Sequence, residues 1–280
     1  MKTIRIETDE SGIVSLIFDR SEASANKIDT LFTEEFGQAV QLIIEQKPKG
    51  VLMRSAKKSF FAGGDLDSIY QTSHAEAGIL FAMVESLKAS MRHLETMGIP
   101  VVACIDGAAL GGGWELALSC HHRLMLSHPK VKVGLPEVTL GLLPGGGGIV
   151  RSVRLFGLQA ALPLLTEGRK FSAKEALSLG LIHEIVDSRE IMINRAKAWI
   201  SDHPQAQQAW DIKGYRMPGG LPTSPKVAPM LAIAPAMIRK KTKGVFPAPE
   251  AILSAMVEGA LVDFDTASRI ESRHFVALVC

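Results

Sequence analysis

The sequence predicts an α/β fold with a helical region at its C-terminal end. Two short apolar segments, residues 50–55 (GVLMRS) and 101–105 (VVACI), have the length and continuous hydrophobicity of buried parallel strands. Longer segments with apolar residues at helical spacing alternate with them, as in parallel crossover units. The chain has 280 residues, of which 47% are hydrophobic, so it is long enough to enclose a large core.

The first elements have clear turn and cap signals. Residues 3–8 and 13–18 are apolar or alternating and flank Ser11-Gly12, which predicts a β-hairpin. A helix is expected after Asp29, a suitable N-cap, because the apolar side chains that follow recur at helical spacing. A second long helix is expected over residues 75–97, where Gly98 and Pro100 end it.

The same alternation continues as far as residue 201. Further strands are expected over residues 123–126 and 182–186, and further helices over about 113–120, 147–156, 158–166, 172–179 and 189–201. We therefore predict a core domain over residues 1–200.

The last 80 residues differ in composition. Residues 201–248 are rich in proline and glycine, with Pro229 and Pro235 inside the apolar segment VAPMLAIAPAMI, and predict an extended connector. Residues 249–280 predict two helices, the second capped by Asp265. No glycine or proline ends the last helix, so the chain is expected to stop either at a cut domain boundary or at a frayed natural terminus.

Charge and cysteine content exclude several classes of protein. The 31 basic and 29 acidic side chains give a net charge of +2, too small and dispersed for a nucleic-acid-binding protein. The three cysteines have no metal-ligand spacing and leave an odd number for disulfides, which favours a reducing, cytoplasmic location. The N-terminus lacks the apolar core of a signal peptide, and no apolar run is long enough to span a membrane.

Three glycine-containing segments are candidates for chemistry, and the first is FFAGGDLD, residues 60–67. Its glycines allow the backbone to point N–H groups at a ligand, although an ordinary turn explains the same residues.

The second candidate is DGAALGGGWE, residues 106–115, which follows an expected strand and enters an expected helix. Such a turn presents N–H groups without acceptors at the positive end of the helix dipole, where a developing negative charge is stabilised. It matches neither a dinucleotide fingerprint nor a P-loop. Glu115 lies in the first helical turn, where a carboxylate is also favourable for purely structural reasons.

The third candidate is VGLPEVTLGLLPGGGG, residues 133–148, in which Glu137 is the single charged residue. Burial there raises the pKa of a carboxyl group and suits it to proton transfer, although a glutamate after proline also starts an ordinary loop. The four glycines predict a closely packed helix entry.

His121 and His122 are adjacent, so their side chains point in opposite directions, and they predict no metal site. Lys57 and Lys58 precede FFAGGD and are expected in solvent or against an anionic ligand.

Taken together, in this order and spacing, these segments resemble the crotonase superfamily of enoyl-coenzyme A hydratases and isomerases. The resemblance covers about residues 3–200 and includes the later segment FSAKEALSLGLIHEIV. It implies a spiral of repeated ββα units. Two residues depart from the family pattern. His121 stands where many members have aspartate, and Trp114 is bulky. Trp114 is expected either to narrow the acyl pocket or to fill the core.

The resemblance also implies site residues. The N–H groups of Gly64 and Gly112 correspond to the oxyanion donors that hold a thioester carbonyl, and the backbone over Ala62, Gly64, Asp65 and Leu66 to the coenzyme A site. Glu115 and Glu137 correspond to the acid and base positions, which favours hydration of a 2-enoyl-CoA in β-oxidation. Isomerisation, another acyl-CoA reaction, or acyl-CoA binding without turnover are the alternatives.

Residues 210–220 and 240–279 are similar to the multifunctional fatty-acid oxidation alpha subunits of this superfamily. There they connect the hydratase portion to a 3-hydroxyacyl-CoA dehydrogenase portion, whose dinucleotide fingerprint this sequence lacks. The resemblance implies an acyl-CoA thioester as substrate, no metal and no separate cofactor. It also implies a homotrimer or association with a dehydrogenase or thiolase component.

Overall fold

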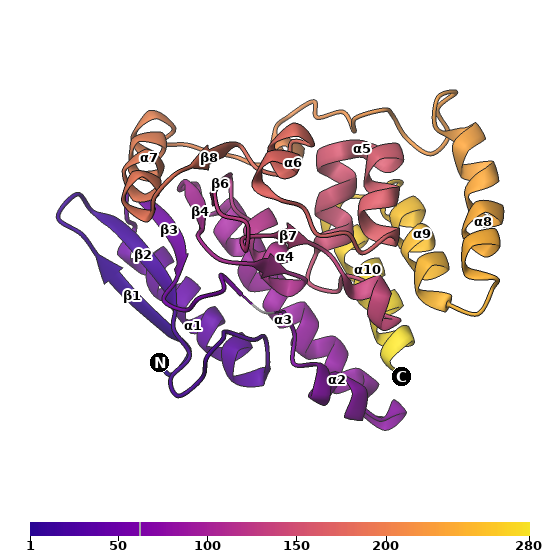
Figure 1. Ribbon diagram of the computed structural model, residues 1–280, viewed down its shortest axis with the longest axis horizontal. Helices are drawn as coiled ribbons and strands as arrows, with labels where there is room; N and C mark the ends of the chain where they lie inside the picture. Colours follow the sequence, from indigo (N-terminus) through magenta and orange to yellow (C-terminus); the bar gives the residue numbers. More distant parts are fainter. Residues whose placement is uncertain (62) are drawn as a thin grey trace. The chain divides into compact units, whose positions relative to one another are not determined.

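The computed structural model describes residues 1–61 and 63–280. Its internal contacts divide the chain into two compact units. The first unit comprises Met1–Leu66, Ser86–Gly134 and Lys170–Gln208, and the second comprises Asp67–Glu85, Leu135–Arg169 and Ala209–Cys280. Figure 1 shows the strands and helices of both units along the chain.

The first unit contains a six-stranded sheet with the order β1-β2-β3-β4-β6-β8. Its strands are β1 (Ile4–Thr8), β2 (Ile13–Phe18), β3 (Gly50–Ser55), β4 (Val101–Ile105), β6 (His122–Leu126) and β8 (Glu184–Val186). The β1–β2 pair is antiparallel, and the other neighbouring pairs are parallel. The hairpin and the parallel strands predicted from the sequence are therefore confirmed.

Helices cover both faces of this sheet in the first unit (Figure 1). α7 (Arg189–Asp202) packs on β3, β4, β6 and β8 through an aliphatic cluster, to which Met192, Ala196 and Ile200 contribute. On the other face, the rings of Phe18, Phe32 and Phe61 lie with their centroids 4.9–5.7 Å apart. Successive side chains of a strand point to opposite faces of the sheet, so the aliphatic cluster and the aromatic cluster lie on opposite faces.

α1 (Thr30–Gln46) begins where the sequence predicts, because the Asp29 carboxylate accepts a hydrogen bond from the Phe32 N–H at 2.9 Å. The remaining elements of the first unit are α4 (Gly112–Leu118), α6 (Ala173–Ser178) and a two-stranded parallel sheet of β5 (Ala109–Leu110) and β7 (Val133–Gly134). α3 (Ala77–Thr96) begins in the second unit and ends in the first.

The second unit is helical. It contains α2 (Leu66–Gln71), α5 (Gly148–Thr166), α8 (Ala228–Thr242), α9 (Pro247–Gly259) and α10 (Phe264–Val279), with the 3-10 helices η1 (His74–Glu76), η2 (Glu137–Leu140) and η3 (Ala209–Asp211). Leu66 itself belongs to the first unit. Gly157 breaks α5 with φ 75° and ψ 168°, so the two helices predicted around that position are confirmed.

α5 has the length and apolar composition of a membrane-spanning helix, with a mean hydropathy of 1.3 over 18 residues. However, 61% of that window is buried inside the protein. A core helix has the same composition.

The prediction of an extended connector is wrong over Ala228–Thr242, which form α8. Pro229 lies in the first turn of α8. A backbone N–H at that position has no acceptor within the helix, so proline removes no helical hydrogen bond there. Pro235 lies inside the helix, and the packing of Ala234 and Ile238 against Leu253 offsets the hydrogen bond that it removes. Asp265 is also not the cap of the last helix; the Asp263 carboxylate accepts the Thr266 N–H at 2.8 Å.

A ring stack at the edge of the first unit makes its stability dependent on pH. The rings of His183, His122 and Trp199 stack in sequence, with centroids 4.5 and 4.6 Å apart, and His203 continues the stack beyond Trp199. Desolvation, followed by the nearby Arg123 guanidinium, lowers the pKa of His122 to about 4 and that of His183 to about 3. His183 Nδ1 also accepts the Arg123 N–H at 3.1 Å.

Folding therefore favours the neutral form of both histidines. Their contribution to stability is complete above the unfolded pKa of about 6.5 and is lost as the pH falls toward 4. We expect the urea midpoint of unfolding to be lower at pH 5.0 than at pH 7.5. We also expect His122→Asn to reduce this difference, whereas the equivalent change at the exposed His128 should leave it unchanged. Equal pH dependence in both variants would exclude the stack as its origin.

Candidate active site

The first part of the site follows β3 and has two isolated β-bridges, at Phe61 and at Gly64. Phe61 forms a parallel bridge to Ala109, and Gly64 forms one to Ile28. The Ile28 N–H donates to the Gly63 carbonyl and the Asp65 N–H donates to the Ile28 carbonyl, both at 2.9 Å. Because these bonds flank Gly64, its own N–H points to the opposite side of the segment.

The second part is the glycine turn between β5 and α4. Gly111 is the N-cap of α4, with φ 54° and ψ −129°, and its N–H donates to the Gly134 carbonyl at 3.0 Å. Gly112 is the first residue of the helix, so its N–H has no acceptor within α4. The prediction that the glycine turn enters a helix is therefore confirmed, and the role of Gly112 as an oxyanion donor stays a prediction.

Close approach explains why this turn consists of glycine. A Cβ atom on Gly112 would lie 2.4 Å from Ile28 Cδ1, and one on Gly113 would lie 2.5 Å from Phe61 Cβ and 2.8 Å from the Phe61 carbonyl oxygen. Gly64 and the glycine turn therefore share one neighbour, Ile28. The structure brings the two predicted oxyanion donors to one region of the first unit.

Replacing Gly113 with alanine tests this packing. We expect Gly113→Ala to destabilise the protein by about 1–3 kcal/mol, because the new methyl group would clash with the backbone of Phe61. Urea denaturation measures the loss. Gly78→Ala in α3 is the matched control, since among the described residues no atom outside its chain neighbours and the backbone of its own helix lies within 4 Å of the added Cβ. Equal stability of the two variants would contradict the close contact.

Glu115 lies beside Gly112. Its side chain is in the first turn of α4 and the residue is 4% exposed. Its Oε2 atom is 3.9 Å from the position that a Cβ on Gly112 would occupy. Trp114, next to it, is 2% exposed and fills the core. The structure therefore places Glu115 beside Gly112, and their joint role with Gly64 stays a prediction.

Glu137 belongs to the second unit. It begins η2 after Pro136, and its carbonyl accepts the Leu142 N–H at 3.1 Å. The residue is partly buried. A Cβ on Gly168 would lie 2.5 Å from Thr139 Cγ2, so η2 packs closely on the segment that follows α5. The pairing of Glu137 with Glu115 stays a prediction.

The four-glycine turn packs against α10, as the sequence suggests. A Cβ on Gly145 would lie 2.6 Å from the Phe275 ring. The buried Glu271 carboxylate accepts the Gly147 N–H at 2.6 Å and the Val150 N–H at 2.9 Å. It supplies acceptors for two N–H groups at the start of α5. Sequence reasoning missed Glu271, because no local pattern links it to a turn 120 residues earlier.

The predicted coenzyme A segment is described in part. Ala62 lies outside the described residues. The Asp65 carboxylate forms an ion pair with Lys27 at 2.8 Å, and Leu66 starts α2 with 37% exposure. Sequence reasoning missed Lys27 and Ile28, which hold this segment from a distant part of the chain. Lys57 pairs with Asp19 at 3.0 Å.

His121 forms hydrogen bonds with the backbone of the core. His121 is buried, and its Nδ1 accepts the Val101 N–H at 3.0 Å while its Nε2 lies 3.1 Å from the Glu95 carbonyl. It therefore satisfies backbone groups of the core. Within residues 1–61 and 63–280, no three potential metal-ligating side chains form a cluster.

Burial raises the pKa of two groups on and directly after β4. At the end of β4, burial raises the pKa of Asp106, although its carboxylate pairs with Arg189 at 2.7 Å. Burial likewise raises the pKa of the Cys104 thiol to about 12. Cys104 is therefore inert as a nucleophile near neutral pH.

Comparison with proteins of known sequence identifies relatives along the entire chain. The chain is 33% identical over 281 residues to the fatty acid oxidation complex subunit alpha of Shewanella amazonensis, and 31% identical over 280 residues to that of Shewanella oneidensis. Each match covers 99% of this chain but 39% of the relative. The chain thus spans about two fifths of these proteins.

Solved structures share the fold. Human mitochondrial delta3-delta2-enoyl-CoA isomerase superposes with a TM-score of 0.68 and 22% identity, covering 99% of this chain and 92% of that one. Enoyl-CoA hydratase from Bacillus halodurans gives a TM-score of 0.67 and 21% identity, covering 99% and 95%. The predicted crotonase-like α/β fold is therefore confirmed. The model of the enoyl-CoA hydratase/isomerase family matches residues 8–210, and the chain belongs to that family.

Proposed function

We propose that this chain hydrates trans-2-enoyl-CoA to 3-hydroxyacyl-CoA. The observation that carries the proposal is the buried Glu115 carboxylate beside Gly112, whose neighbour Ile28 also forms the bridge to Gly64. A carboxylate next to outward-pointing backbone N–H groups suits a reaction that moves a proton while negative charge develops on a carbonyl oxygen.

In the proposed mechanism, the N–H groups of Gly64 and Gly112 donate to the thioester oxygen. This stabilises the enolate that forms as water adds to the β-carbon. Glu115 accepts the proton from that water as its oxygen bonds to carbon. Glu137, which carries a proton at the start, then delivers it to the α-carbon, and the carbonyl re-forms. Proton exchange with solvent returns Glu115 to the carboxylate and Glu137 to the acid. The net change is the addition of one water across the double bond, so the chemistry itself uses no metal or separate cofactor.

The test is the loss of the conjugated enoyl-thioester absorbance in trans-2-enoyl-CoA substrates of short, medium and long acyl chains. We expect turnover with at least one of them. Measurable acyl-CoA binding without absorbance loss at any chain length would overturn hydration and favour a binding subunit.

A second candidate is double-bond isomerisation, which the family description and the fold shared with a solved isomerase favour. In that reaction Glu137 alone would move the proton between two carbons. The variants Glu115→Gln and Glu137→Gln separate the two reactions. Isomerisation as the main activity requires Glu137 and tolerates loss of Glu115, whereas hydration requires both.

We also propose that the backbone from Ala62 to Leu66 holds coenzyme A, and that the chain associates with other components of fatty-acid oxidation. The names of the relatives support the second proposal, since they are subunits of a fatty acid oxidation complex. Co-purification with a thiolase or dehydrogenase component would test it, and the mass in solution would distinguish this association from a homotrimer.

A further inference from the structure

The first unit contains a groove of about 910 Å³ at the end of the sheet remote from the candidate active site. Residues at or just before the amino ends of β2, β3 and β4 line it, namely Ile13, Lys49 and Ile99. Gly64 and Gly112, in contrast, follow the carboxyl ends of β3 and β4. A ligand in the groove would therefore leave the candidate active site open.

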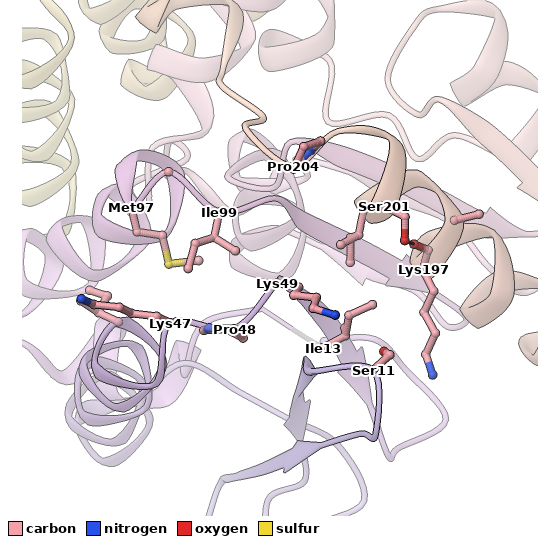
Figure 2. A pocket seen from close by; sticks show the side chains of 14 residues that line it. Ser11, Ile13, Lys47, Pro48, Lys49, Met97, Ile99, Lys197, Ser201 and Pro204 are labelled. Carbon is pink, nitrogen blue, oxygen red and sulfur yellow. Dashed lines mark hydrogen bonds between the residues drawn. The ribbon is translucent and has the colours of Figure 1, made fainter.

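The floor of the groove is aliphatic and firmly packed. Ile13 and Ile200 are buried, and a Cβ on Gly50 would lie 2.5 Å from Ile200 Cγ2. Ile44, Met97 and Ile99 continue the apolar lining and are only partly buried. Figure 2 shows Met97 and Ile99 next to each other, and Ile13 next to Lys49. Such a surface favours the alkyl chain of a ligand.

The charged groups of the groove are all positive. Of its 14 lining residues, Lys47, Lys49 and Lys197 are basic and none carries a carboxylate. Figure 2 shows Lys49 in the middle, with Lys47 and Lys197 extending toward opposite sides.

One of the three charges is already compensated. Lys197 pairs with Asp9. Burial by itself would raise the pKa of Asp9, but hydrogen bonds from Lys197, Ser11 and the Ile13 N–H hold it below its usual range. In the described part of the chain, neither Lys47 nor Lys49 forms an ion pair. Two positive charges therefore remain for an anion.

Lys49 is held in place at the groove. Its N–H donates to the Gly12 carbonyl at 2.9 Å. Its Cγ, Cδ and Cε atoms lie 3.8 Å from the position that a Cβ on Gly12 would occupy, so its stem runs along the β1–β2 turn. The apolar stem thus rests on protein while the ammonium group faces the groove.

We propose that this groove binds a fatty-acid carboxylate, with the alkyl chain on the floor formed by Ile13, Met97 and Ile200 and the carboxylate at Lys49. Its volume is within the range of small-molecule sites. A fatty acid has a negatively charged end, which suits the lysines, and an aliphatic chain, which suits the apolar floor. A purely apolar ligand would leave the lysines without a partner, and a small inorganic anion would leave the apolar floor uncovered.

Binding of dodecanoate below its micelle concentration to the full chain tests the proposal by calorimetry, with saturating crotonyl-CoA present to occupy acyl-CoA sites. We expect one molecule per chain. Lys47→Glu combined with Lys49→Glu should weaken binding at least tenfold, and Met97→Asp should weaken it comparably. Lys130→Glu, an exposed lysine elsewhere in the first unit, should leave it unchanged. Dodecanol should bind at least tenfold more weakly than dodecanoate.

Several results would overturn the proposal. These are no binding of dodecanoate, equal affinity in the double lysine variant, equal affinity of dodecanol, or displacement by crotonyl-CoA. A diazirine-bearing fatty acid gives the position independently, since it should label the peptides that contain Met97 or Ile200. Labelling confined to other peptides would place the fatty acid elsewhere.

Discussion

Replacing Glu115 with glutamine is expected to reduce the rate of enoyl-CoA hydration by about a hundredfold or more. Glutamine nearly preserves the shape of the side chain but cannot accept the proton of the attacking water, and a positioned acid or base typically contributes about 10²–10⁴ in rate. Because Glu115 lies in the first turn of α4, the fold should also lose a favourable charge–dipole interaction of about 0.3–1 kcal/mol.

The measurement is kcat and KM from the enoyl-thioester absorbance, together with the urea midpoint of each variant. We expect kcat to fall while KM changes little, because in the proposed mechanism the backbone donors bind the substrate and this carboxylate moves the proton. Glu10→Gln, an exposed position in the same unit, should have wild-type kinetics. Wild-type kcat in Glu115→Gln would remove Glu115 from the mechanism.

Replacing Glu271 with alanine is expected to destabilise the protein by about 2–5 kcal/mol, since it leaves two buried N–H groups at the start of α5 without acceptors. Both bonds are short, at 2.6 and 2.9 Å, and the residue is 1% exposed. Glu271→Gln keeps one acceptor oxygen and should lose less. Because the turn at Gly147 lies within the same unit as η2, we expect hydration to weaken as well.

Urea denaturation measures these losses. Glu258→Ala is the matched control from the neighbouring helix α9, where the carboxylate is 53% exposed and pairs only with His274. Such a surface change should alter the free energy of unfolding by about 0.5 kcal/mol or less. If Glu271→Ala is as stable as Glu258→Ala, the carboxylate does not hold the turn.

Local patterns predicted the elements around the site well. Asp29 caps α1, the apolar strands 50–55 and 101–105 are β3 and β4, and the glycine turn leads into α4. Each of these features depends on neighbouring residues, through cap chemistry, hydrophobic periodicity or the special conformations of glycine. The family resemblance then pointed to Gly112 and Glu115, which the structure places together.

The prediction was wrong where distant packing outweighs local preference. Pro229 and Pro235 indicated an extended connector, yet α8 forms because Ala234 and Ile238 are buried against α9. Asp265 and Asp263 are equally good caps by residue type. In the structure, Asp263 has an extended backbone and precedes Phe264, the first residue of α10, so Asp263 is the cap.

By itself, the sequence determined the α/β class, the order of strands and helices, and the two glycine turns, because these follow from spacing and backbone freedom within short segments. Only the tertiary structure decided that Ile28 pairs with Gly64 and also contacts Gly112, that Glu271 closes the start of α5, and that three lysines share an aliphatic groove. These contacts join residues far apart in the chain. Their geometry depends on how the elements pack, which no local pattern encodes.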